Sequence, residues 1–186
     1  WWGLHGGSIQ WEGIPVFPQQ LDAYGNDAVG YYCRKFKADL LITLIDLWVL
    51  DHNILGNLYP TMWAPLFPID HADPIPPQIA ERFDSAHHLL VYSEYARGEV
   101  AAYQGGRYAN KVIRIPHGVD TDAYRPVSSP EERGAFRKVV SGGEWDDGHF
   151  VIGMVAANKG YPSRKSFPEA IEAFARFASA HSNARL

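Results

Sequence analysis

The chain has a single cysteine, Cys33, among its 186 residues. One cysteine cannot form an intrachain disulfide, which excludes a disulfide-stapled secreted fold and suits a reducing compartment. Val29, Tyr32 and Phe36 stand at helical spacing from Cys33. This pattern is typical of a core helix face, so we expect a buried thiol rather than a reactive one.

Long apolar runs and a strong net charge are also missing. The most apolar stretch, residues 38–50, is interrupted by Asp46 and is shorter than the roughly 20 residues that a membrane-spanning helix needs. The formal net charge of −4 gives no general attraction to nucleic acid or to an anionic membrane. We therefore expect a cytoplasmic protein with no nucleic-acid partner, and peripheral membrane contact remains open.

Two nucleotide-binding motifs are absent as well. The sequence has no Walker-type glycine-lysine-serine spacing and no dinucleotide glycine fingerprint. These absences count against a nucleotide hydrolase and against an ordinary dehydrogenase. Any phosphate chemistry must come from a different local site.

The pattern that is present is an alternation of short apolar runs with longer segments of helical period. We expect strands at 14–17, 39–45, 62–69, 88–92 and 111–115, and helices around 29–36, 76–83 and 93–103. Such alternation predicts an α/β fold with a Rossmann-like, mostly parallel sheet and flanking helices. Residues 39–45 form a nearly unbroken apolar run, as expected of a strand buried on both faces.

The alternation of apolar runs and helical segments is interrupted after Asp120. Ser129, Pro130 and Glu132 signal the start of a short helix in a linker-like segment. We expect a strand at 151–156. Ser166 and Glu169 form a capping-box pattern, which predicts the start of a second helix. We predict domains at 1–120 and 149–186 with a linker at 121–148. The last segment resembles the first β-α unit of a second Rossmann-like domain, since it cannot close a core alone.

Three cations gather in the loop before that last helix: Lys159, Arg164 and Lys165. A helix N-terminus offers free backbone N–H groups and a positive dipole end, so it is suited to bind phosphate. The cations could neutralise a diphosphate leaving group. A solvated basic loop without a ligand is the alternative.

A second motif follows the expected strand at 111–115. His117 and Gly118 precede Asp120 in a connection that proline closes at Pro126. The glycine permits an unusual backbone turn, and the carboxylate follows it. Alone, this motif is an ordinary turn.

Together the two motifs resemble a known family. The pairing of residues 117–120 and 124–126 with residues 153–155 and 164–165 is similar to the domain junction of family-4 glycosyltransferases of the GT-B fold. The resemblance extends over nearly the whole chain, including residues 11–16 and 39–46. It implies an acceptor-side domain that lacks its first β-α unit and the start of a donor-side domain. On this resemblance we expect a piece of a longer enzyme, truncated at both ends and inactive alone.

The resemblance implies a reaction and residues to carry it. The reaction is transfer of a sugar from a nucleotide-diphosphate sugar to a hydroxyl acceptor (a glycan, a lipid or a small molecule), with retention and without a required cofactor. Lys165 matches the family's phosphate-binding lysine, whereas Lys159 stands where an arginine is usual, and the two side chains bind phosphate differently. His71 resembles the acceptor-domain histidine near the transferred sugar.

Each of these assignments has an alternative. His71 can be a loop histidine satisfied by Asp70 or Asp73, and a metal site from these three residues would need a distant fourth ligand, so no metal is expected. Asp46 and Trp48 could share a sugar-binding cleft, although Trp48 could equally belong to the core. The resemblance makes His117, Gly118 and Asp120 further candidates for this cleft. The rival functions are a GT-B sugar-nucleotide epimerase or phosphorylase and a non-catalytic nucleotide- or sugar-binding module. The family's donor-binding glutamates would lie beyond Leu186, so the donor sugar and base cannot be read.

Overall fold

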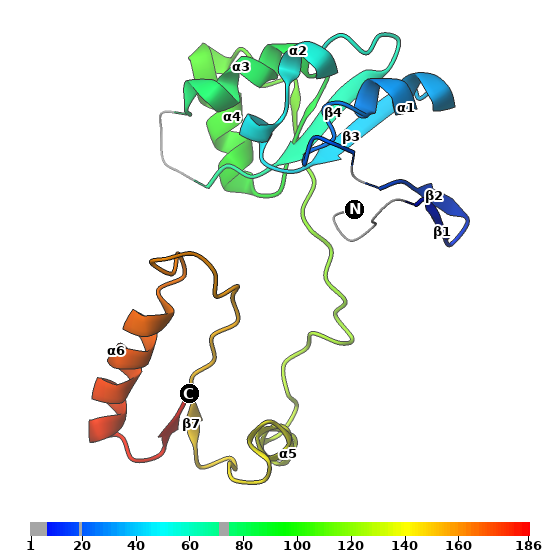
Figure 1. The fold of residues 1–186 in the computed structure, drawn as a ribbon. Coiled ribbons are helices and arrows are strands. Elements are labelled where there is room, and N and C mark those ends of the chain that lie inside the picture. The colour runs from blue at the N-terminus through cyan, green and yellow to red at the C-terminus, as the bar shows by residue number, and fades with distance from the viewer. Residues whose placement is uncertain (1–6, 19, 71–74) are drawn as a thin grey trace. The chain divides into compact units, whose positions relative to one another are not determined.

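The computed structural model describes residues 7–18, 20–70 and 75–186 of the chain (Figure 1). By the density of its internal contacts the chain divides into two compact units, Trp1–Gly118 and Val119–Leu186.

The first unit is an α/β structure built around a parallel sheet. Its elements are β1 (Ile9–Trp11), β2 (Ile14–Val16), α1 (Val29–Phe36), β3 (Leu40–Leu44), the 3₁₀ turn η1 (Leu47–Val49), α2 (His52–Leu55), β4 (Met62–Phe67), α3 (Pro77–Ser85), β5 (Leu89–Val91), α4 (Glu94–Gly106) and β6 (Val112–Arg114). Strands β3, β4, β5 and β6 pair in this order, all parallel. The Rossmann-like α/β class predicted from the sequence is confirmed. The hairpin of β1 and β2 was not predicted.

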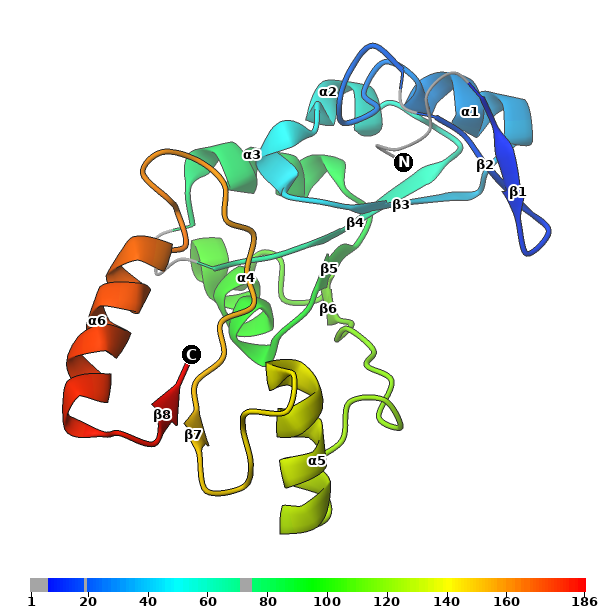
Figure 2. The ribbon, with the colours of Figure 1, turned by 60° about the horizontal axis from the view of Figure 1, so that its bottom comes forward.

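Helices α1, α2 and α3 lie on the same side of β3 and β4 (Figure 2), and α4 packs into the same core. Right-handed crossovers between strands that follow one another in order place every connecting helix on the same side. The core accordingly joins alternate strand residues to side chains of all four helices, among them Cys33, Leu55, Phe83 and Val100. Trp63 and Phe67 of β4 are buried in this layer, at 2% and 0% exposure.

The other face of β3 is exposed within the described part of the chain. Leu40, Ile42 and Leu44 alternate with the inward residues and are 48%, 55% and 63% exposed. The expectation that this strand is buried on both faces was therefore wrong for the described residues. An unbroken apolar run does not show which face is covered, because the order of the strands decides on which side the helices lie.

Local signals explain several element ends. The Ser93 hydroxyl accepts a hydrogen bond from the Ala96 amide and begins α4. The backbone of α4 leaves the helical region at Tyr103, which matches the end expected from the sequence. Cys33 is buried as predicted, and burial raises the pKa of its thiol, which disfavours the reactive thiolate.

The second unit contains a parallel strand pair joined by a helix. Its elements are α5 (Pro130–Ser141), β7 (Phe150–Val151), α6 (Phe167–Ala180) and β8 (Ala184–Arg185), and β7 pairs with β8 in parallel. The expected strand at 151–156 is shorter than predicted, because β8 offers only two residues for pairing.

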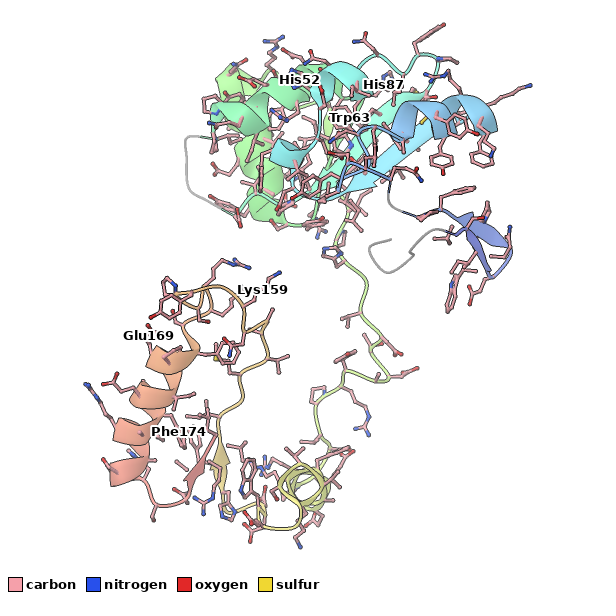
Figure 3. All side chains as sticks on the ribbon, in the orientation of Figure 1. His52, Trp63, His87, Lys159, Glu169 and Phe174 are labelled. Atoms are coloured by element: carbon pink, nitrogen blue, oxygen red, sulfur yellow. The ribbon has the colours of Figure 1, made fainter. Side chains whose placement is uncertain are left out.

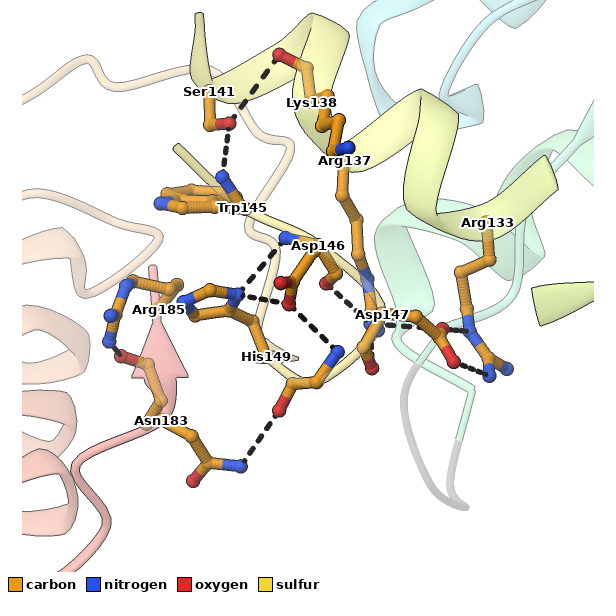
Figure 4. Close-up of polar contacts among 12 residues, drawn as sticks. Arg133, Arg137, Lys138, Ser141, Trp145, Asp146, Asp147, His149, Asn183 and Arg185 are labelled. Atoms are coloured by element: carbon orange, nitrogen blue, oxygen red, sulfur yellow. Dashed lines mark hydrogen bonds and ion pairs between the residues drawn. The ribbon is translucent and has the colours of Figure 1, made fainter. Parts of the chain in front are cut away.

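A polar network connects α5 to the segment before β7 (Figure 4). Arg133 forms a two-point ion pair with Asp147, which lowers the pKa of that carboxyl group. Arg137 donates to the carbonyls of Asp146 and Asp147 at 3.2 and 3.0 Å. The His149 ring lies 2.9 Å from the Asp146 carboxylate. These contacts fix the start of β7, and they thereby fix the start of the loop that follows this strand.

Within the described residues, no helix combines the length and the apolar character that crossing a membrane requires.

Because the core lies on one face of the sheet, substitutions on the two faces should differ in their effect on stability. Phe67→Ala removes a fully buried ring and should lower the free energy of unfolding by about 3–5 kcal/mol, whereas Ile42→Ser on the exposed face should change it by less than about 1 kcal/mol. Chemical denaturation of both variants measures the difference. A loss for Ile42→Ser as large as that for Phe67→Ala would show that this face of β3 is covered.

The contacts of Glu132 at the start of α5 predict how stability depends on pH. The Arg125 guanidinium, with the hydroxyl and amide of Ser128, lowers the pKa of Glu132 from 4.5 to about 2. A pKa that is lower in the folded state contributes stability above the unfolded value, and this is lost as pH falls from about 4.5 towards 2. Glu132→Gln should flatten the pH dependence of unfolding in this window. Equal slopes in the wild type and in Glu132→Gln would refute the assignment.

Candidate functional site

Four polar side chains follow the four parallel strands of the first unit. Asp46 comes after β3, Asp70 after β4, Tyr92 after β5 and His117 after β6. The carboxyl ends of parallel strands meet at one edge of a sheet, and this edge is where ligands of open α/β folds bind. Asp46 and His117 were predicted as cleft residues from the sequence.

A cavity of about 410 Å³ lies at this edge. It is lined by Asp46, Leu47, Trp48, Pro68, Asp70, Pro76, Gln78 and Ile79. The structure therefore brings Asp46 and Trp48 together with the residue that precedes His71. Trp48 is 57% exposed, so it is not a core residue of the described chain.

The backbone next to Trp48 is held by Arg82 of α3. The Arg82 Nε atom donates to the carbonyls of Leu47 and Leu50 at 2.9 and 3.2 Å, and Nη2 donates to the carbonyl of Trp48 at 3.3 Å. A guanidinium has several donors in a fixed plane and can satisfy a turn of carbonyl groups at once. Arg82 thus fixes the η1 turn that presents Trp48 to the cavity.

Asp46 stands at the N-cap position of η1, but its side chain makes no capping bond. In the described part of the chain its carboxylate has neither a hydrogen-bond nor an ion-pair partner. The carboxylate is exposed and therefore retains its full capacity to accept hydrogen bonds from a ligand.

Tyr92 and His117 form an aromatic pair at the ends of β5 and β6. Their ring centroids are 4.1 Å apart at an interplanar angle of 27°. The Tyr92 hydroxyl donates to the Leu66 carbonyl at 3.3 Å. Burial, and secondarily the negative charge of Asp46, raise the pKa of Tyr92. Sequence reasoning missed Tyr92, although its place as the last residue of an expected strand was a usable signal.

Gly118 and Asp120 have simpler local roles. Gly118 does not adopt positive φ, and an added Cβ atom would meet nothing within 4 Å. The unusual turn that glycine permits at this position does not form. The Asp120 carboxylate accepts the amides of Asp122 and Ala123 at 3.0 and 3.1 Å, so it closes its own turn, a common role of aspartate.

The three predicted cations lie on the loop between β7 and α6. Lys159, Arg164 and Lys165 are exposed, and Figure 3 labels Lys159 on this loop. Among the residues that the structure describes, their side chains have no ion-pair or hydrogen-bond partner. Their charges are therefore available to an anion.

The start of α6 differs from the sequence expectation. Ser166 has a positive φ of 53° and its side chain makes no capping bond, so the predicted capping box with Glu169 does not form. The left-handed backbone at Ser166 turns its hydroxyl away from the role that an extended N-cap residue takes. The first turn of α6 thus begins without a side-chain cap.

His71 lies outside the described residues, and so does part of the alternative metal set of Asp70, His71 and Asp73. His71 and Asp73 belong to residues 71–74, so the structure gives no position for either. Among residues 7–18, 20–70 and 75–186, no three side chains of metal-binding type come together.

No protein-family model matches the chain, and a comparison with curated proteins found no match either.

The aromatic pair makes a prediction about His117. Tyr92→Leu removes the ring over which the imidazole stacks and should shift the His117 ring-proton resonances, because the ring current of the phenol is lost. Tyr92→Phe keeps the ring and should leave these resonances close to the wild-type positions, at a cost of about 0.5–1.5 kcal/mol for the lost hydrogen bond to Leu66. NMR of the histidine ring protons measures both. Unchanged resonances in Tyr92→Leu would contradict the stack.

Proposed function

We propose that this protein is a glycosyltransferase, which moves a sugar from a nucleotide-diphosphate sugar to a hydroxyl group of an acceptor. The observation that carries the proposal is the basic loop of the second unit. Lys159, Arg164 and Lys165 are exposed and unpaired within the described residues, and they precede a 14-residue helix whose first turn has no side-chain cap. The family resemblance of these motifs supports the same reading.

The loop has the chemistry that a diphosphate needs. A helix start presents backbone N–H groups and the positive end of a dipole to an anion. Cations beside it add charge-assisted hydrogen bonds, which are about twice as strong as neutral ones. When the bond between the anomeric carbon and the diphosphate oxygen breaks, negative charge grows on the diphosphate. In our proposal Lys159, Arg164 and Lys165 stabilise that charge.

The first unit supplies the features expected of an acceptor site. Its cavity lies at the carboxyl edge of a parallel sheet and contains an exposed indole and two carboxylates, Asp46 and Asp70. Carboxylates accept hydrogen bonds from sugar hydroxyls, and an aromatic face packs against ring C–H groups. We propose that the acceptor hydroxyl is presented here, and that its oxygen forms the new bond to the anomeric carbon while its proton is released.

His71 keeps its role as part of the proposal. It follows Asp70, which lines the cavity, and the resemblance assigns it to hydrogen bonds with the transferred sugar. Retention of configuration rests on the resemblance alone. A cytoplasmic location is supported by the single, unpaired cysteine, which suits a reducing compartment.

The basic loop makes the decisive prediction for this function. Lys165→Ala should weaken the binding of a nucleoside diphosphate by roughly tenfold, because a hydrogen bond to a charged group contributes about 1.5–3 kcal/mol. Lys159→Ala should act in the same direction. Isothermal titration calorimetry with uridine and guanosine diphosphate measures both effects.

Lys138→Ala on α5 is the matched control, since it removes one lysine from the same unit but not from the loop. Its affinity should equal that of the wild type. Equal affinity in Lys165→Ala, Lys159→Ala and the wild type would remove the loop from the proposed site.

A further inference from the structure

We propose that the cavity at the carboxyl edge of the sheet receives an acceptor group that carries hydrogen-bond donors and no negative charge. The acceptor unit is an uncharged or amine-bearing sugar, and a phosphorylated or carboxylated sugar is rejected. This inference rests on the proposed function, because it identifies the chemical class of acceptor for that site.

The charge of the cavity lining points to this class. Of the residues that line it, Asp46 and Asp70 are charged, and the remaining ones are apolar or neutral: Leu47, Trp48, Pro68, Pro76, Gln78 and Ile79. Ionised carboxylates only accept hydrogen bonds. A ligand group that meets them must therefore donate, as a hydroxyl or an ammonium group does.

Within the described part of the chain, the cation next to this lining, Arg82, is not available to neutralise an anionic ligand. Arg82 is already bonded to the carbonyls of Leu47, Leu50 and Trp48, and it donates to the Gln78 carbonyl as well. It also pairs with Glu81 at 3.5 Å, and its side chain is only 13% exposed. Turning the guanidinium towards a phosphate would break these bonds and leave the part-buried Leu50 carbonyl without its donor, which costs free energy.

The tryptophan and the size of the cavity favour a sugar among donor-bearing ligands. Trp48 is 57% exposed although its backbone is fixed by Arg82. A large apolar ring held at a cavity is suited to the C–H face of a sugar, while the polar groups beside it set the orientation. The volume of about 410 Å³ lies within the range of roughly 300–1,000 Å³ that small-molecule sites occupy.

The carboxylate of Asp46, unpaired among the described residues, discriminates between positively and negatively charged ligands. This carboxylate makes no hydrogen bond or ion pair within the described chain, so its charge is not neutralised before the ligand arrives. An ammonium group gains from that charge and a phosphate is repelled by it, which separates the affinities by roughly tenfold or more at low ionic strength.

The test compares three sugars of different charge: neutral methyl glucoside, protonated glucosamine and anionic glucose 6-phosphate. Titrations at low salt and mildly acidic pH, where the amine is protonated, follow the indole N–H resonance of Trp48, which Trp48→Phe identifies. Following this resonance separates the cavity from the basic loop, where a phosphate ester has its own proposed site. Glucosamine should bind most tightly, methyl glucoside measurably, and glucose 6-phosphate roughly tenfold more weakly than the glucoside.

Asp46→Asn removes the charge and keeps the size of the side chain. It should abolish the preference for glucosamine and raise the affinity for glucose 6-phosphate towards that of the glucoside. Glu144→Asn, a change of an acidic residue in the other unit, should leave the ranking unchanged.

Three results would overturn the inference: equal or tighter binding of glucose 6-phosphate in the wild type, an unchanged ranking in Asp46→Asn, or no response of the Trp48 resonance to any of the sugars. None of these decides nucleotide binding at the basic loop, which the calorimetric titration measures separately. A transferase with an anionic acceptor would contradict the sugar titration but still bind the nucleoside diphosphate in the calorimetric titration.

Discussion

The parallel pairing of β3, β4, β5 and β6 is the constraint on which the rest of the first unit depends. Because these strands follow one another in order and all run the same way, their carboxyl ends share one edge and their helices share one face. The first consequence gathers Asp46, Asp70, Tyr92 and His117 at a single edge. The second leaves the apolar outer side of β3 exposed within the described chain.

The sequence predicted most of this framework, and its errors have physical causes. Strand positions follow from short apolar runs, and the start of α4 from the Ser93 cap, because both signals are local. The exposure of Ile42 could not be predicted, since it depends on which strands are neighbours. The capping box at Ser166 failed because its backbone is left-handed, a state that the residue type does not reveal. Tyr92 was missed because its partner His117 is 25 residues away.

The two units offer complementary chemistry for the proposed transfer. The second unit presents positive charge at Lys159, Arg164 and Lys165 that no described residue neutralises, whereas the cavity of the first unit presents carboxylates and an indole. A diphosphate suits the former, and a donor-bearing sugar suits the latter. Neither set of side chains is required by the packing of its own unit, since both are exposed. The three cations and Asp46 have no ion-pair or hydrogen-bond partner among the described residues, which distinguishes them from a structural network such as that of Arg133 and Asp147.

The most direct test of the account is a backbone-amide NMR titration of the protein with a nucleoside diphosphate, because it shows where the phosphates bind. The account predicts the largest shifts between Lys159 and Glu169, with the amides at the start of α6 among them. Shifts that avoid this segment and fall elsewhere, or no shifts at concentrations where the nucleotide saturates, would contradict the proposal that the basic loop binds the donor diphosphate.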